Sequence, residues 1–197
     1  MGERPVKTYP TLGCCGLDCG LCPRYYTVGT SRCPGCSGPG FFDKHPSCGY
    51  ITCCVKKKGL EVCAQCDEFP CSRFASRSVS AGEYDSVLTY KKVRPNLESI
   101  RVYGLEPFIE RQRKRIRLLE KMLEGFDDGR SRSFYCIAAT LIPIDDLEAS
   151  LAEAERGVKA DGVAAEDVRT KAGVLRELLQ GCAGRRGVEL KLRKKRE

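Results

Sequence analysis

Residues 13–23 read GCCGLDCGLCP, and four of them are cysteines. Cys15, Cys19 and Cys22 have the spacing C-x3-C-x2-C, and Cys14 precedes the first of them. Thiols this dense form disulfides, bind iron or zinc, or carry out redox chemistry. The rest of the sequence has to distinguish among these uses.

The other cysteines favour a metal over disulfides. The chain has 197 residues and 14 cysteines, of which 12 lie within residues 14–71. Its first residues are polar and lack the apolar stretch of a signal peptide. No apolar run approaches the roughly 20 residues that cross a membrane. These features predict a cytoplasmic protein with no membrane association, and cytoplasmic thiols stay reduced. A cluster of reduced cysteines this dense predicts a metal site.

Composition divides the chain into two predicted domains. Residues 1–72 are rich in Cys, Gly and Pro and show no helical period, so they cannot bury enough apolar surface to fold unaided. We expect thiolate–metal bonds to stabilise this small, loop-rich, zinc-ribbon-like module, because metal binding supplies folding free energy in such modules. Residues 73–197 are rich in Leu, Glu, Arg and Ala, and predict a helical domain with a basic C-terminal tail.

Helical spacing of apolar residues, with Pro and Gly near the ends, supports the second domain. It predicts helices at residues 94–104, 106–126, 133–142, 145–157 and 164–181. Residues 133–142 also suit a buried strand, and we favour the helix. In the tail, Val188, Leu190 and Leu192 alternate with charged residues, which is typical of a strand. The predicted fold class is α+β and mostly helical, with at most one terminal strand.

Cysteine spacing defines the candidate metal ligands. Two thiolates at C-x2-C spacing can reach one ion from a tight turn, and two such turns complete a tetrahedron. C-x2-C occurs three times within residues 15–71, with further cysteines at loop spacing. The ten positions best placed as ligands are Cys15, Cys19, Cys22, Cys33, Cys36, Cys48, Cys54, Cys63, Cys66 and Cys71.

The sequence favours two zinc ions as the cofactor, because paired C-x2-C turns in a small loop-rich domain are typical of structural zinc. An iron–sulfur cluster is the alternative, supported by the cysteine triplet followed by Pro23. Disulfides or redox-active thiols are a third interpretation. The same triplet occurs in radical enzymes that use S-adenosylmethionine, but those enzymes need a large βα array, which this sequence does not predict.

Several motifs together resemble a known family. CGLDCGLCP, CPGC, the doublet CC with CAQCDEFPC, DGRSRSFYCIAATLIP and GVELKLRKK resemble the Cys-rich prokaryotic domain-of-unknown-function family 3795, over nearly the whole chain. The resemblance implies a metal-binding protein of bacteria or archaea and supplies no activity. The matching thiols are the ten candidates, with the looser match at Cys48, whereas Cys14 and Cys53 are additional.

No catalytic constellation accompanies the cysteines. His45 is the one histidine, which excludes zinc held by three histidines and the H-E-x-x-H motif. No phosphate-binding or dinucleotide-binding glycine motif occurs, and no carboxylate pair stands out as acid and base. The sequence therefore assigns no catalytic residue and favours a protein that is not an enzyme.

Basic residues make nucleic acid a further candidate partner. The formal net charge is +8, and bases cluster after Arg185 and between Arg111 and Arg117. Acidic residues accompany the second cluster and no aromatic residues alternate with the bases, so this partner is not favoured. We interpret Lys56–Lys58 as a solvated loop.

These observations predict a cytoplasmic cysteine-rich protein that binds structural zinc through clustered thiolates and interacts with an unknown protein partner. The first alternative is an iron–sulfur or thiol redox protein. The second alternative is a zinc-dependent nucleic-acid binder.

Overall fold

The computed structural model describes residues 6–72, 74 and 84–194, and all regular secondary structure in them is helical. None of the described helices is both long and apolar enough to cross a membrane. The chain divides into two compact units: unit 1 is Met1–Gln112 with Arg193–Glu197, and unit 2 is Arg113–Leu192. The predicted module, residues 1–72, is the first part of unit 1. Residue 73 lies outside the described residues, and the domain boundary beside it stays a prediction.

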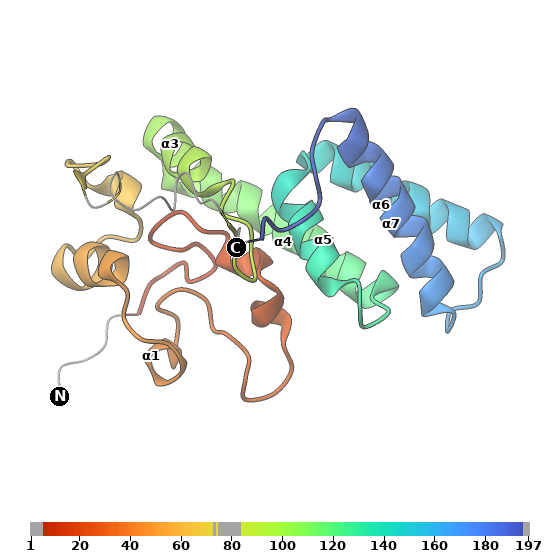
Figure 1. The fold of residues 1–197 in the computed structure, drawn as a ribbon, viewed down its shortest axis with the longest axis horizontal. Coiled ribbons are helices and arrows are strands. Elements are labelled where there is room, and N and C mark those ends of the chain that lie inside the picture. The colour runs from red at the N-terminus through yellow and green to blue at the C-terminus, as the bar shows by residue number, and fades with distance from the viewer. Residues whose placement is uncertain (1–5, 73, 75–83, 195–197) are drawn as a thin grey trace. The chain divides into compact units, whose positions relative to one another are not determined.

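Unit 1 begins with loops joined by short helical turns, drawn from red to yellow in Figure 1. These turns are η1 (Cys19–Leu21), η2 (Pro23–Tyr26), α1 (Phe41–Lys44), η3 (Ile51–Lys57) and η4 (Cys63–Gln65). Frequent glycine and proline explain why no longer helix forms here. Leu12, Ile51 and Val62 are almost fully buried and form an apolar cluster.

Helix α3 (Val93–Tyr103) completes this apolar cluster and packs against η4. Its buried face carries Leu97 and Ile100, which are at most 4% exposed. Gly104 ends the helix with a φ of 90°, a left-handed conformation that glycine adopts without strain. Helix α4 (Leu105–Phe126) begins at the next residue.

Unit 2 contains the later part of α4 and three further helices. These are α5 (Arg132–Leu141), α6 (Ile144–Ala160) and α7 (Val168–Arg185). Helices α6 and α7 pack along each other (Figure 1). The fully buried side chains of this unit include Leu119, Tyr135, Leu147 and Leu175. Unit 2 therefore has an apolar core of its own.

The helices predicted for the second domain are confirmed, with some ends shifted. The helix favoured for residues 133–142 is observed as α5, which spans Arg132–Leu141. Helix α7 continues through Gly181, which the sequence marks as its end. Leu179 and Cys182 beside this glycine are buried, so packing outweighs the low helix propensity of glycine. Helix α6 likewise continues past Gly157.

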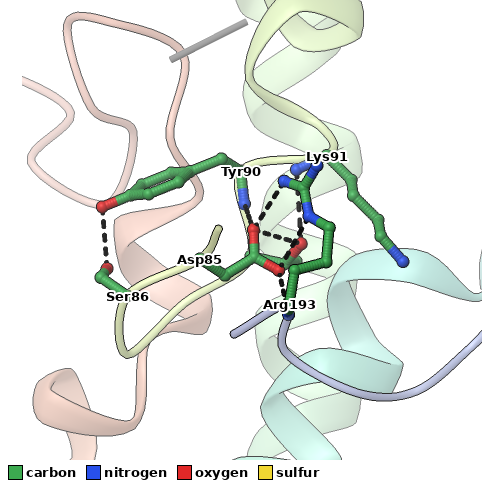
Figure 2. Close-up of polar contacts among 6 residues, drawn as sticks. Asp85, Ser86, Tyr90, Lys91 and Arg193 are labelled. Atoms are coloured by element: carbon green, nitrogen blue, oxygen red, sulfur yellow. Dashed lines mark hydrogen bonds and ion pairs between the residues drawn. The ribbon is translucent and has the colours of Figure 1, made fainter. Parts of the chain in front are cut away.

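The C-terminal segment, residues 188–194, is held by the side chain of Asp85 and not by pairing in a sheet. Residues 188–194 form no strand in the described structure, so the predicted terminal strand and the α+β class are not confirmed. A strand needs a partner that continues the hydrogen-bond ladder. Here one backbone bond forms, from the Asp85 N–H to the Arg193 oxygen over 2.9 Å. The Asp85 carboxylate accepts the Arg193 N–H at 2.9 Å and its guanidinium at 2.8 Å (Figure 2).

Candidate metal centre

The first cysteine motif lies on a compact loop whose shape depends on glycine. The Gly13 N–H donates to the backbone oxygen of Leu17 over 2.7 Å. Gly16 has a φ of 91°, and a Cβ atom there would lie 2.5 Å from the backbone oxygen of Val93 in α3. The tight approach of this loop to α3 leaves Cys14 only 1% exposed.

The C-x2-C turn at residues 33–36 is fixed against the N-terminal segment. The Cys36 N–H donates to the backbone oxygen of Pro10 over 2.7 Å. Gly35 has a φ of 85°, and a Cβ atom there would lie 2.3 Å from the same oxygen, so the turn requires glycine. The turn brings Cys36 next to Cys14, whose backbone N–H donates to the Cys36 sulfur over 3.5 Å.

The later cysteines reach the same region from two further segments. Cys53 and Cys54 lie on η3, which is a π-helix, a geometry frequent at functional sites. Cys54 is 3% exposed, and its thiol donates to the backbone oxygen of Leu60 over 3.5 Å. The Cys63 N–H donates to the backbone oxygen of Cys14 over 2.8 Å. Segments far apart in the sequence therefore meet around Cys14.

Sulfur atoms contact one another within this region. The Cys14 thiol hydrogen-bonds with Cys36, Cys48 and Cys54, and these bonds, with burial, raise its pKa far above the usual value. The bond from Cys14 lowers the pKa of Cys36 to about 7. Bonds from Cys14 and then Cys63 lower the pKa of Cys54 to about 4. Because Cys36 and Cys54 accept these bonds, the network favours their thiolates, the form in which sulfur binds metal.

A buried lysine lies among these thiols. Lys7 is 4% exposed, and its ammonium group donates to the backbone oxygen of Leu12. After the bonds from Cys14, the Lys7 charge also lowers the pKa of Cys36 and Cys54. A buried ammonium group is costly unless anions lie close to it. Lys7 is therefore suited to balance the charge of buried thiolates.

A second feature of unit 1 is a pocket of about 360 Å³, counting its open mouth. Its thiols are Cys53, Cys54, Cys63, Cys66 and Cys71. The rings of Tyr50, Phe69 and Phe74 form the apolar part of its wall. Five thiols thus face one small space.

Lys58 also lines this pocket. Its ammonium nitrogen lies 3.1 Å from the Cys66 sulfur and 2.7 Å from the Glu68 carboxylate. Lys56, Lys57 and Lys58 are exposed, as expected for a solvated segment, although Lys56 and Lys57 lie on η3 and not in a loop. The positive charge of Lys58 is close enough to stabilise a thiolate at Cys66.

The cysteine motifs, their loops and the core beneath them form one folded segment. Residues 11–76 match the family DUF3795, proteins of unknown function. The resemblance seen in the sequence is confirmed for this DUF3795 segment, which is about one third of the chain. The motifs at 128–143 and 187–195 lie outside the match, so its expected extent over nearly the whole chain is not confirmed. No curated protein and no solved structure matches the chain.

The predicted ligands of the DUF3795 segment occupy three kinds of position. Cys36, Cys48, Cys54 and Cys63 belong to the sulfur network, and Cys66 and Cys71 line the pocket. The remaining candidates, Cys15, Cys19, Cys22 and Cys33, are half-buried. Burial raises the pKa of Cys15 to about 12 and also raises those of Cys19 and Cys22. Like Cys14 and Cys63, whose pKa values are also raised, these three thiols are harder to ionise than a free thiol.

All 14 cysteines are free thiols. As the side chains stand, the described residues contain no group of three or more Cys, His, Asp or Glu that could hold a metal ion. The donor set nevertheless fits a thiophilic metal. Sulfurs bound to one zinc at about 2.3 Å lie roughly 3.8 Å apart, similar to sulfurs in hydrogen-bond contact. Binding would require the S–H protons to leave and the sulfurs to turn toward a common centre.

Cysteine spacing alone did not find several residues of this region. Cys14, expected to be an additional thiol, makes sulfur contacts with three other cysteines, and Cys53 lines the pocket. Lys7 carries no sequence signal that points to thiols. Lys58 follows the Cys53–Cys54 doublet closely, which is the one signal that places a base near sulfur.

Proposed function

We propose that the DUF3795 segment binds metal through thiolates, with zinc as the favoured metal. The sulfur contacts around Cys14 carry this proposal, because the buried thiols of Cys36 and Cys54 and the exposed thiol of Cys48 meet it from other segments. The ligands are drawn from the ten cysteines predicted from spacing, together with Cys14. Lys7 and Lys58 offset part of the negative charge that thiolate ligation creates.

The proposed role of the metal is to stabilise the fold. The segment consists of loops and short turns, and its apolar cluster also depends on α3. Binding free energy at a structural thiolate site contributes directly to folding, which is what such a segment needs. Interaction with a protein partner and a cytoplasmic location stay predictions from the sequence.

An iron–sulfur cluster is the second candidate, and the pocket favours it. Five of its lining residues are cysteines, and aromatic residues complete its wall. Such clusters are held by cysteine thiolates, and nearby hydrogen bonds and burial set their potentials. The contact of Lys58 with Cys66 would act in this way.

Metal and sulfide analysis of protein purified without oxygen tests the proposal. We expect zinc, no colour and no acid-labile sulfide. A brown protein with absorbance near ~400 nm, iron and sulfide would support the second candidate instead. If the reduced segment holds neither metal and still resists proteolysis, both candidates are wrong.

A further inference from the structure

Cys54 contacts thiols on two sides of the cysteine-rich region. Its sulfur accepts hydrogen bonds from Cys14 and from Cys63. Cys14 belongs to a first group, which comprises Cys14, Cys36 and Cys48. Cys63 belongs to a second group, which lines the pocket and comprises Cys63, Cys66 and Cys71. Cys54 therefore contacts a member of each group.

We propose that the Cys54 thiolate bridges two metal ions. This inference rests on the proposed function. The first ion is completed by Cys14, Cys36 and Cys48. The second ion is completed by Cys63, Cys66 and Cys71. Each ion then has the four thiolates of a closed structural site, although Cys54 is shared.

The position of Cys54 suits a bridging ligand. Its sulfur already accepts two S–H donors, and two metal ions would take the places of those protons. Cys54 is 3% exposed, so water does not compete for its lone pairs. The backbone bond of 2.8 Å between Cys63 and Cys14 keeps the two groups close.

Charge also favours the bridge. Two separate zinc sites with eight thiolates carry about −4, whereas sharing one thiolate lowers this to about −3. Buried negative charge is costly, so the smaller value is preferred. Lys7, which is 4% exposed, and Lys58, 3.1 Å from the Cys66 sulfur, each supply one positive charge. As two ions bind, the seven thiols release their protons to solvent.

The neighbouring cysteine provides a matched control. Cys53 precedes Cys54 on η3 and also lines the pocket. The thiols that hydrogen-bond to Cys14 are Cys36, Cys48 and Cys54. The inference therefore assigns the shared position to Cys54 and leaves Cys53 out of both sites.

Cadmium is a suitable probe, because it prefers thiolates and has a spin-½ isotope. Reduced, metal-free full-length protein is loaded with ¹¹³Cd²⁺ under anaerobic conditions, and bound cadmium is counted. We expect two ions per chain and two resonances that split each other through the shared sulfur. Cys54→Ser should lower the count from two to below one, whereas Cys53→Ser should keep both ions and the splitting.

The outcomes separate this inference from the proposed function. Two resonances without mutual splitting in the unaltered protein, or loss of ions in Cys53→Ser and not in Cys54→Ser, overturn the bridge and leave thiolate binding intact. Failure of the unaltered protein to bind any cadmium overturns both. Because the splitting is measured in the unaltered protein, the test does not depend on a variant that folds.

Discussion

Cys63 donates its backbone N–H to the backbone oxygen of Cys14 over 2.8 Å, and this bond joins the first and last cysteine motifs of the chain. A disulfide-free segment with this many loops needs such cross-connections, because each loop alone buries little apolar surface. We therefore expect the loss of a proposed ligand in either motif to disturb the other. The following predictions build on this mutual dependence.

Cys36→Ser and Cys66→Ser should each unfold residues 6–72, because each removes a proposed ligand of the metal whose binding would supply folding free energy. Cys182→Ser should leave the segment folded, since Cys182 is buried in the core of unit 2. Limited proteolysis under reducing conditions, with the fragments identified by mass, measures the difference. Equal resistance of the segment in all three variants would contradict the ligand assignment.

Gly35→Ala should destabilise the segment by about 2 kcal/mol or more, because its Cβ would meet the Pro10 oxygen at a positive φ. Gly29→Ala is the matched control: its φ is 83°, but no atom lies within 4 Å of the added Cβ. We expect the control to cost only about 1 kcal/mol. Urea unfolding followed by circular dichroism compares the two, and equal costs would show that the contact with Pro10 is unimportant.

Lys7→Met should weaken metal binding, because it removes a buried positive charge beside the anionic site. The expected loss is roughly tenfold in affinity, or about 1.4 kcal/mol. Lys57→Met is the control, since Lys57 is exposed on η3. Competition with a coloured chelator gives both affinities. Equal effects of the two substitutions would remove Lys7 from the site.

Asp85→Asn should lower the free energy of unfolding by about 3 kcal/mol, because it breaks a buried ion pair with Arg193. Burial alone would raise the pKa of Asp85, but hydrogen bonds from Arg193 and Tyr90 outweigh it and lower the pKa. The pKa of Asp85 is therefore lower in the folded protein than in the unfolded chain. The stabilisation by its ion pair is present at neutral pH and disappears as the pH falls through the folded-state pKa.

The difference between Asp85→Asn and the unaltered protein should therefore be constant from about pH 7 to 5 and shrink below about pH 4. Glu98→Gln serves as a control, because its partner Arg94 is exposed and such pairs contribute little. Urea unfolding at several pH values measures both differences. A difference that grows as the pH falls would have the wrong sign for this carboxylate.

Local periodicity was sufficient to predict most helices. Leu97 and Ile100 in α3, and Leu175 and Leu179 in α7, recur at the spacing that buries one helical face. The predicted strand at Val188, Leu190 and Leu192 is not confirmed. Alternation of apolar and charged residues describes a single strand, and a strand also needs a hydrogen-bonded partner. The partner strand depends on the rest of the fold, and none forms in the described residues.

The candidate site was predicted in part, for the same reason. Spacing identifies neighbours such as Cys33 and Cys36, which share one turn. It cannot show that Cys14 meets Cys48 and Cys54, because that contact depends on how separate loops pack. Lys7 was missed because a single lysine in a polar stretch looks solvated until its burial is known.

The ion pair between Asp85 and Arg193 joins residues 108 positions apart, so it can form only late in the synthesis of the chain. When Asp85 leaves the exit tunnel, its partner has not been translated, and its carboxylate stays hydrated. The helices encoded in between can form while synthesis continues. The early-translated unit 1 thus acquires its last ion pair only after the whole of unit 2 has been made.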